Sequence, residues 1–243
     1  MSAKRGKNPF KRALITGAAG GIMSELTQRL ADDGMALILL DLDEKGLEKL
    51  RSNLMKKTNA RSYVVDMTDL EGLEKMLHQI AEENGPVDLI VAGAGIDRPL
   101  TMESFDWRLG SDHFTINTVA NYVICSVLIP RMIQQGGGHF IGIASLAAFG
   151  GFPYESAYCG SKAAFKSILE SARAELSHTG VSFSTVCPGF VNTEMIAGNA
   201  YDVKDSAMDV KKAVEKIYRK AVVKQKAMVI FPFLTYISMC FLN

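Results

Sequence analysis

Short apolar runs alternate with longer helix-like stretches along nearly the whole chain, and this alternation constrains the fold more than any other feature. The runs that suit buried strands are Ala13–Thr16, Ala36–Asp41, Ser62–Asp66, Leu89–Ala92, His139–Ser145 and Val181–Cys187. The stretches that suit helices are Gly21–Asp33, Glu44–Lys57, Asp69–Asn84, Asp112–Gln135 and Tyr154–Thr179. Apolar strands separated by helices are typical of a parallel sheet covered on both faces. The pattern predicts an α/β fold with three layers and a doubly wound parallel sheet of about seven strands.

Composition and charge indicate one globular unit. Hydrophobic residues make up 48% of the 243 residues, which is enough for a large core, so we expect a single domain over residues 1–243. The 27 Lys and Arg residues nearly balance 26 Asp and Glu residues. The basic run near the start continues into no basic face, so residues 1–10 are expected to be a frayed N-terminus and not a nucleic-acid arm. The four cysteines and four histidines lack metal-ligand spacing, which favours a reduced, cytoplasmic setting without a metal site.

The C-terminal segment 228–243 is apolar and uncharged, and Pro232 interrupts it. A membrane-spanning helix needs roughly 20 consecutive apolar residues, and this segment is shorter. We expect a last strand at about Met228–Phe231, followed by a segment that packs on the domain or on a neighbouring subunit. The alternative is contact with a membrane surface or a path for lipid entry.

A glycine-rich turn follows the first predicted strand. Open parallel sheets bind ligands beyond the carboxyl ends of their strands, where the strand order reverses. Gly17, Gly20, Gly21 and Ile22 lie at such an end and open a predicted helix. Bare backbone at the glycines can approach a pyrophosphate, and the helix N-terminus offers N–H donors. The turn predicts a Rossmann-like dinucleotide site.

Acidic residues end the next two predicted strands. The carboxylate of Asp41 can accept hydrogen bonds from both hydroxyl groups of a ribose and would repel a 2′-phosphate. No Lys or Arg follows Asp41 directly, and none lies in the glycine turn, so NAD is expected as the cofactor in preference to NADP. Asp66 and Met67 end the third predicted strand, where we expect them to border the adenine.

The stretch SLAAFGGFPYESAYCGSK places Ser145 at a strand end and spaces Tyr158 and Lys162 four residues apart. In a helix, residues with this spacing lie on one face. A lysine ammonium beside a phenol stabilises the phenolate, which is expected to lower the pKa of Tyr158 from its usual value near 10. Such a tyrosine can exchange a proton with an alcohol or carbonyl near neutral pH. Ser145 would orient the substrate oxygen.

With these motifs, the sequence resembles the single-domain short-chain dehydrogenase/reductase family. The family pattern TGxxxGxG falls on residues 16–23, and the family's catalytic tetrad falls on Asn117, Ser145, Tyr158 and Lys162. The family's PGxVxT stretch, which holds the nicotinamide carboxamide, falls on Pro188, Gly189, Val191 and Thr193. The resemblance implies that Asn117 holds a water linking the lysine to solvent. It also implies a homodimer or homotetramer built through long paired helices.

Two positions depart from the family pattern. Where the family has Asn-Asn-Ala-Gly after the fourth strand, this chain has Ala92-Gly93-Ala94-Gly95, so Ala92 and Gly93 would contact the cofactor through their backbone. Met23 replaces the last glycine of the turn, and its flexible side chain has two expected positions, in the core or over the pyrophosphate. Both departures predict a working site with weakened cofactor binding.

The function expected from these residues is hydride transfer between NAD(H) and a hydrophobic secondary alcohol or ketone. The expected pocket wall is nearly all apolar, with Arg98 close by in the sequence: Ile96, Leu146, Ala147, Phe149, Phe152, Phe190, Met195 and Ile196. Residues 192–208 are expected to form a mobile substrate lid. One alternative is a non-catalytic dinucleotide-binding or interaction module. Another is a sugar-nucleotide epimerase or dehydratase, which shares the Tyr-x-x-x-Lys pair but usually adds a C-terminal substrate domain.

Overall fold

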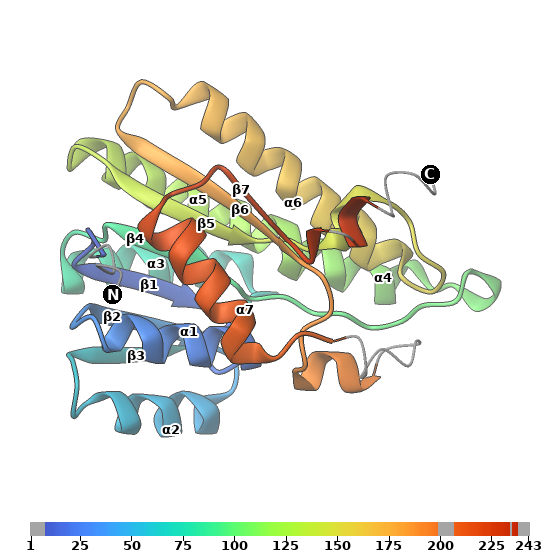
Figure 1. Ribbon diagram of the computed structural model, residues 1–243, viewed down its shortest axis with the longest axis horizontal. Helices are drawn as coiled ribbons and strands as arrows, with labels where there is room; N and C mark the ends of the chain where they lie inside the picture. Colours follow the sequence, from blue (N-terminus) through green and yellow to red (C-terminus); the bar gives the residue numbers. More distant parts are fainter. Residues whose placement is uncertain (1–7, 199–206, 234, 238–243) are drawn as a thin grey trace, which may run out of the picture.

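Seven strands form one parallel sheet in the computed structural model, which describes residues 8–198, 207–233 and 235–237. The strand order is β3-β2-β1-β4-β5-β6-β7 (Figure 1). The strands are β1 (Arg12–Thr16), β2 (Ala36–Asp41), β3 (Ala60–Val64), β4 (Leu89–Ala92), β5 (Gly138–Ile143), β6 (Val181–Pro188) and β7 (Met228–Phe231). The doubly wound parallel sheet predicted from the sequence is confirmed, as is the last strand at Met228–Phe231.

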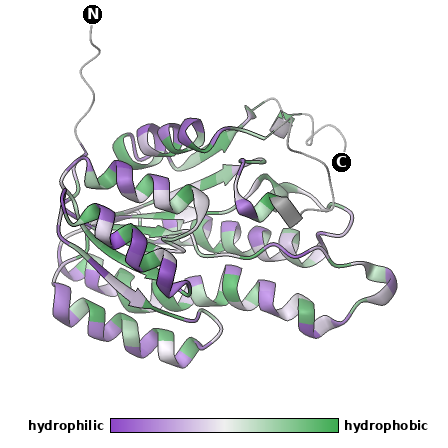
Figure 2. Cartoon of the chain, turned by 90° about the horizontal axis from the view of Figure 1, so that it is seen from below, coloured by the Kyte–Doolittle hydropathy of each residue, from purple (hydrophilic) through white to green (hydrophobic). Residues whose placement is uncertain are grey.

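Helices cover both faces of the sheet. One face carries α1 (Gly21–Ala31), α2 (Glu44–Leu54) and α7 (Val210–Ile217), and the other carries α3 (Leu70–Asn84), α5 (Ala120–Gln134) and α6 (Ser156–Glu175). Neighbouring strand residues enter opposite clusters: Leu14 packs with the α3, α5 and α6 side chains, and Ile15 with those of α1, α2 and α7. This alternation with both faces buried explains the continuously apolar strands. In Figure 2 the helices show both polar and apolar residues, as expected for helices with one face on a sheet.

The strand order reverses between β1 and β4, which pair in parallel with Thr16 opposite Ala92. The helices that follow these two strands lie on opposite faces of the sheet, so a crevice opens between them at the carboxyl ends of the strands. The side chain of Thr16 is fully buried there, and its hydroxyl oxygen accepts hydrogen bonds from the N–H groups of Gly93 and Ala94, both at 3.1 Å.

Several predicted boundaries were wrong. The third strand is Ala60–Val64 and not Ser62–Asp66, so Asp66 and Met67 follow the strand in the loop before α3. This strand lies at the edge of the sheet, where half-exposed residues blur the apolar pattern. Helix α7 was not predicted, although the buried Ala213, Val214 and Ile217 recur at helical spacing.

Helical structure before β5 also begins earlier than predicted. It starts at α4 (Trp107–Phe114), passes through a π-helical turn at Thr115–Val119 and continues as α5. By length and composition this stretch, Trp107–Gln134, is apolar enough to cross a membrane, but 56% of its apolar window is buried inside the protein. Residues such as Ile124 pack against the sheet, which accounts for the hydropathy of the helix.

Candidate active site

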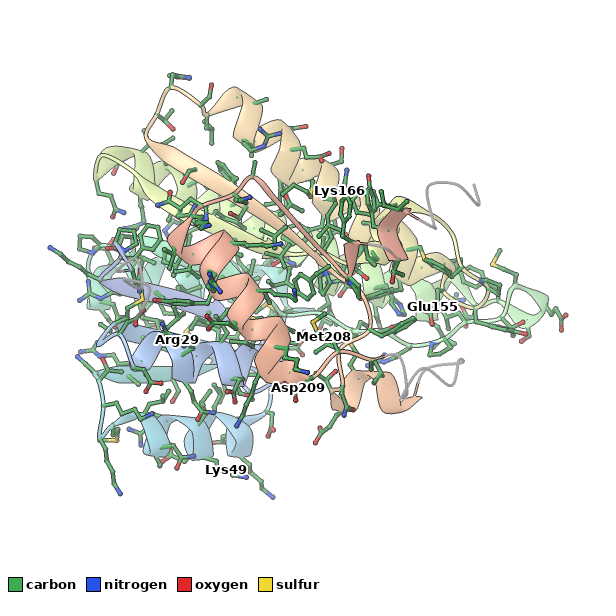
Figure 3. All side chains as sticks on the ribbon, viewed as in Figure 1. Arg29, Lys49, Glu155, Lys166, Met208 and Asp209 are labelled. Carbon is green, nitrogen blue, oxygen red and sulfur yellow. The ribbon has the colours of Figure 1, made fainter. Side chains whose placement is uncertain are left out.

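A cavity of about 1180 Å³ lies beyond the carboxyl ends of the central strands. It lies on the side of the molecule where Glu155, one of its lining residues, is labelled in Figure 3. Its walls are the start of α1, the loops after β4 and β5, the first turns of α6 and the segment after β6. The cavity therefore occupies the place where a doubly wound sheet binds its ligand.

The glycine turn has the backbone geometry that a phosphate-binding loop needs. Gly17 has a φ of +66°, and a Cβ there would lie 2.8 Å from the backbone of Ala94, so only glycine fits. Gly20 precedes α1, and no side chain among the described residues caps the helix or adds an acid to its first turn. Gly20, Gly21 and Ile22 line the cavity. The N–H groups at this uncapped helix start can therefore serve a bound anion.

Met23 turns into the core and leaves the phosphate face of the turn clear. Its side chain is only 4% exposed and belongs to the cluster between α1 and the sheet. The sulfur lies against Gly93, where an added Cβ would be 2.6 Å from Met23 Cγ and closer still to the sulfur. The two departures from the family pattern, Met23 and Gly93, therefore pack against each other. The absence of a side chain at residue 93 leaves the space that the methionine fills.

Asp41 reaches the glycine turn from the neighbouring strand. Its Oδ2 accepts a hydrogen bond from the N–H of Ala19 at 2.8 Å, and its Oδ1 accepts one from the N–H of Asp43 at 3.0 Å. Ala19 lines the cavity, whereas Asp41 does not itself line it. The carboxylate thus supports the turn and stands beside it, at the end of β2.

Four other residues predicted for the cofactor site do not line the cavity: Gly17, Asp66, Met67 and Ala92. Asp66 is exposed, and hydrogen bonds from the hydroxyl and N–H of Thr68 lower the pKa of its carboxyl. Met67 is buried in the cluster on the α3 side of the sheet. Ala92 and Gly17 are not part of the cavity wall, and Gly93 is.

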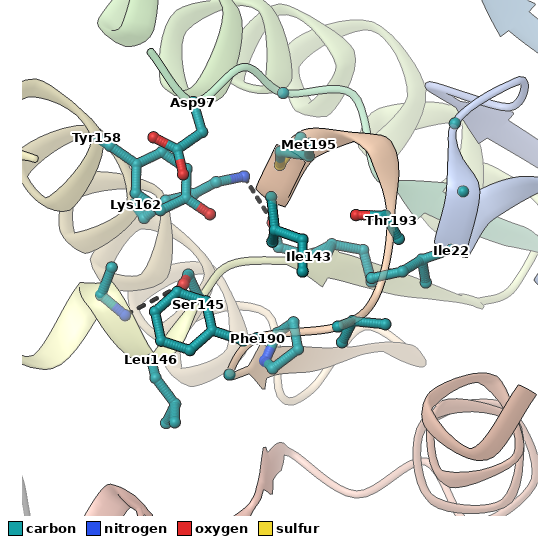
Figure 4. A pocket seen from close by; sticks show the side chains of 18 of the residues that line it. Ile22, Asp97, Ile143, Ser145, Leu146, Tyr158, Lys162, Phe190, Thr193 and Met195 are labelled. Atoms are coloured by element: carbon teal, nitrogen blue, oxygen red, sulfur yellow. Dashed lines mark hydrogen bonds between the residues drawn. The ribbon is translucent and has the colours of Figure 1, made fainter. Parts of the chain in front are cut away.

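Ser145, Tyr158 and Lys162 come together on the cavity wall (Figure 4). Ser145 lies two residues after β5, and its Oγ accepts a hydrogen bond from the N–H of Ala147 at 3.1 Å. Tyr158 and Lys162 lie one turn apart on α6. Lys162 is only 5% exposed, and its Nζ donates a hydrogen bond to the carbonyl oxygen of Ile143 at 3.1 Å and lies 5.8 Å from the centre of the Tyr158 ring.

The expected lowering of the Tyr158 pKa is not found. Burial raises the pKa of the phenol, a hydrogen bond with Ser145 opposes this, and the nearby Asp97 and Glu155 carboxyls raise it further. Burial also lowers the pKa of Lys162 to about 8. The prediction failed because burial is the largest influence on the pKa of both groups, and because the Lys162 ammonium donates its hydrogen bond to the Ile143 carbonyl oxygen.

Asn117 fastens the backbone beside the site and does not line the cavity. It is fully buried in the π-helical turn. Its Oδ1 accepts from the N–H of Ile96 at 2.8 Å, and its Nδ2 donates to the Ile96 carbonyl oxygen and to Ser161 Oγ, both at 3.0 Å. Its Oδ1 and Lys162 Nζ both border the space where a side chain at Gly95 would be. The amide therefore connects the loop after β4 to α6.

The segment after β6 forms the opposite wall. Pro188, Gly189, Val191 and Thr193 all line the cavity, and Thr193 packs against Gly21 at the start of α1. The predicted lid, 192–208, is described only at 192–198 and 207–208, and its middle lies outside the described residues. Its two ends are joined, because Val191 forms a bridge to Met208 and the Asn192 N–H donates to the Met208 carbonyl oxygen at 2.9 Å.

The predicted substrate wall is incomplete. Leu146, Ala147, Phe152, Phe190, Met195 and Ile196 line the cavity, whereas Ile96 and Phe149 do not. The Phe149 ring packs edge-on against Tyr236, with ring centres 4.8 Å apart, and so holds the described part of the C-terminal segment on the protein. Two acids on the wall, Asp97 and Glu155, were not predicted from the sequence. Their positions close to the motifs, two residues after Gly95 and three before Tyr158, were the available signal.

The residues present fit a dinucleotide cofactor. The turn at Gly17 brings bare backbone to the cavity, the start of α1 is uncapped, and Met23 does not obstruct either. The cavity runs from this turn to Lys162 and the segment after β6, so one elongated molecule can contact all three.

Comparison with known proteins identifies the family. Residues 11–204 match the short chain dehydrogenase family. The chain is 34% identical over 184 residues to 17-beta-hydroxysteroid dehydrogenase 13 of Homo sapiens, a match that covers 74% of this chain and 61% of that protein. It is 30% identical over 192 residues to 1-deoxy-11-beta-hydroxypentalenate dehydrogenase of Streptomyces exfoliatus, covering 77% of this chain and 70% of that one.

Solved structures share the fold. A short-chain dehydrogenase from Sphingobium yanoikuyae in complex with NADPH superposes with a TM-score of 0.84 at 24% identity, over 96% of this chain and 91% of that one. An alcohol dehydrogenase from Thermococcus sibiricus complexed with 5-hydroxy-NADP superposes with a TM-score of 0.78 at 24% identity, over 85% of this chain and 88% of that one. By its sequence, its sheet and the match to the family over most of its length, the chain belongs to the short-chain dehydrogenase/reductase family of oxidoreductases.

Proposed function

We propose that this protein is an NAD(H)-dependent oxidoreductase that interconverts a largely apolar secondary alcohol and its ketone. One observation carries the proposal: Ser145, Tyr158 and Lys162 line the same cavity as the glycine turn at the start of α1. A proton-transfer group and a dinucleotide cradle therefore face one space. The cofactor supplies hydride transfer at the carbinol carbon, and the protein aligns the reacting groups.

Each polar residue has a distinct part in this proposal. Tyr158 exchanges the proton of the substrate hydroxyl, and Ser145 holds the substrate oxygen beside the phenol. Lys162 holds the nicotinamide ribose and returns the proton to the phenol. Asn117 keeps the loop at Ile96 in place beside Lys162, and the water relay inferred from the family resemblance would start at this residue.

The preference for NAD over NADP is supported by charge. Asp41 and Asp43 stand beside the glycine turn, and the residue between them is the exposed Leu42. A 2′-phosphate bound there would approach two carboxylates, which repel it. Structures with the same fold bind NADP-type cofactors, so the fold alone does not determine the preference. The proposed preference for NAD therefore rests on the acidic residues of this chain.

An apolar substrate is supported by apolar side chains of the cavity wall. Leu146, Phe152, Phe190 and Met195 give part of the cavity an apolar surface. The names of two relatives specify a hydroxysteroid and a hydroxypentalenate. We also propose that segment 192–208 acts as the lid over this space, since its two described ends are joined beside the cavity wall.

We further propose a cytoplasmic homodimer or homotetramer. The exposed Phe114, Val119 and Tyr122 on the α4–α5 stretch are apolar residues that a second copy would cover. Cys125, Cys159 and Cys187 are buried free thiols, as in a reducing compartment. Light scattering of the purified protein measures the oligomeric state.

The proposed function is tested by titrating the protein with NADH and NADPH and following the fluorescence of the bound nucleotide. We expect micromolar affinity for NADH and much weaker binding of NADPH. Tyr158→Phe is expected to abolish turnover of apolar ketones while NADH binding stays unchanged. If neither nucleotide binds, the alternative of a non-catalytic module holds. Retained activity in Tyr158→Phe would show that another group transfers the proton.

A further inference from the structure

Two carboxyl groups line the cavity beside Tyr158, and the proposed reaction uses neither of them. Asp97 follows β4, and Glu155 directly precedes α6. Glu155 is only 5% exposed, and neither of its carboxyl oxygens accepts a hydrogen bond from an N–H or hydroxyl group in the described part of the chain. The Oδ1 atom of Asp97 is also buried and also has no hydrogen-bond partner in the described part of the chain. Buried polar atoms are nearly always hydrogen-bonded, so this pair requires an explanation.

Within the described residues, neither helix capping nor an arginine partner accounts for the two acids. Glu155 occupies the position before α6, but its side chain makes no capping bond to the helix. The nearest cation in sequence, Arg98, turns away and pairs with Asp112 at 3.3 Å on the exposed surface of α4. The two acids are therefore not explained by helix capping or by an ion pair with Arg98.

Backbone contacts hold the two acids together. The N–H of Arg98 donates to His113 Nε2 at 3.0 Å, and the N–H of Leu100 donates to the carbonyl oxygen of Tyr154 at 2.7 Å. Tyr154 has a φ of +63°, a left-handed conformation that is costly for a residue with a Cβ. The loop that carries Asp97 is thus hydrogen-bonded to Tyr154, the residue before Glu155. Tyr154 makes this contact in a strained backbone conformation.

The titratable groups around Asp97 and Glu155 leave the two carboxyls able to accept hydrogen bonds from a ligand. Burial, a hydrogen bond with the Asp97 carboxyl and repulsion from its charge raise the pKa of Glu155 to about 8, so the two acids share one proton near neutral pH. One shared proton leaves the remaining carboxyl oxygens of the pair without a donor. The other titratable groups facing it are Tyr158, Cys159 and Lys162 of α6 and His113 of α4. Burial lowers the pKa of His113. The Lys162 ammonium is attracted by the Asp97 carboxylate but donates its hydrogen bond to the Ile143 carbonyl oxygen.

We infer that the substrate carries a hydrogen-bond donor, an ammonium or hydroxyl group, that binds between Asp97 and Glu155 while its reacting oxygen faces Ser145 and Tyr158. The inference rests on the proposed function and narrows it. The apolar body of the substrate lies against Phe152 and Phe190, and its donor group lies near the reacting carbon. A donor in this place supplies the missing hydrogen bonds, and an ammonium also restores charge balance when both acids ionise.

Three matched ketones test the inference. They share one aromatic ring and differ only in carrying a methyl, a hydroxyl or an ammonium group near the carbonyl. Their binding to the protein, with and without NADH, is measured by calorimetry, which needs no turnover. The proteins are the wild type, Glu155→Gln, Asp97→Asn and the control Glu175→Gln, which makes the same change at an exposed site near the end of α6. Circular dichroism confirms that each variant is folded.

We expect the wild type and Glu175→Gln to bind the two donor-bearing ketones on the order of tenfold more tightly than the methyl compound. In Glu155→Gln and Asp97→Asn this preference should shrink severalfold. Near pH 8 the ammonium compound should also release a proton from the wild-type pair, detected as a heat of binding that depends on the buffer. The hydroxyl compound should bind without that release, which distinguishes the two kinds of donor.

Equal binding of all three ketones by the wild type would overturn the inference. A donor preference that survives in both Glu155→Gln and Asp97→Asn would do the same. The failure of the proposed function has a different signature: donor-bearing ketones bind with the expected preference, but none is reduced when NADH is supplied. Turnover without a donor preference would leave the proposed function standing and remove the inference.

Discussion

The packing of Met23 against Gly93 leads to a quantitative prediction about stability. A Cβ at Gly93 would lie 2.6 Å from Met23 Cγ, closer still to its sulfur, and 3.0 Å from the Thr16 carbonyl oxygen. Gly93 is not among the residues with positive φ, so alanine is permitted by the backbone and the cost comes from packing alone. We expect Gly93→Ala to lower the free energy of unfolding by about 1–3 kcal/mol, the usual cost of overpacking a core.

A double-mutant cycle isolates this contact. Met23→Ala alone should lower the free energy of unfolding by about 2–5 kcal/mol, because it leaves a cavity in the cluster beneath α1. In that background Gly93→Ala should cost little, since the two closest contacts of the added Cβ, both with Met23, are removed. The cycle should therefore give a coupling energy of about 1–3 kcal/mol.

Urea denaturation of the four proteins, followed by circular dichroism, measures the cycle. Gly151→Ala is the control, because no atom lies within 4 Å of its added Cβ and its φ is not positive. Both glycine replacements reduce the entropy of the unfolded chain similarly, so their difference reports the packing cost. Additive effects, with a coupling below about 0.5 kcal/mol, would refute the arrangement of Met23 described above.

Three further predictions concern the site. Asp41→Ser should raise NADPH affinity relative to NADH by about tenfold, because it removes a carboxylate beside the 2′-position; fluorescence titration measures the ratio, and an unchanged ratio would contradict the role of this charge. Folded Glu155 keeps its proton between pH 4.5 and about 8, whereas the unfolded chain loses it, so stability falls as pH rises through this window. Urea midpoints at both ends of the window should show a shallower fall in Glu155→Gln; parallel slopes would contradict the raised pKa. Asn117→Ala should lower the free energy of unfolding by on the order of 3 kcal/mol, because it leaves the N–H and carbonyl of Ile96 without partners. Loss of turnover at unchanged stability would instead assign Asn117 to proton relay alone.

The fold was predictable where burial is complete. β1, β2 and β4 are buried on both faces, and their apolar runs marked them to within one residue. β3 is an edge strand with exposed and half-buried residues, and its predicted position was two residues too late. The missed helix α7 contains three lysines, which hid the apolar side of its helix in a simple reading of composition.

The sequence could predict those parts of the site that the order and direction of the strands bring together. Parallel strands end at one edge, so Ser145 after β5 and the glycine turn after β1 had to lie near each other. Side-chain direction needed the structure. The sequence could not distinguish a methionine in the core from one over the pyrophosphate, nor show that Lys162 donates to Ile143 while Tyr158 is buried.

The two departures from the family pattern illustrate why single positions are a poor measure of whether a cofactor site is intact. Met23 taken alone suggests an obstructed turn, and the missing amide at Gly93 taken alone suggests a loosened strand end. In the structure the two positions depend on each other, because the Met23 side chain occupies space that a side chain at residue 93 would need. The N–H groups of Gly93 and Ala94 meanwhile find an acceptor in Thr16, so the two central strands remain tied without an asparagine side chain. Cofactor affinity at this turn should therefore depend on Met23 and Gly93 together. Replacing Met23 alone by glycine should weaken cofactor binding, because it opens a cavity beneath the turn.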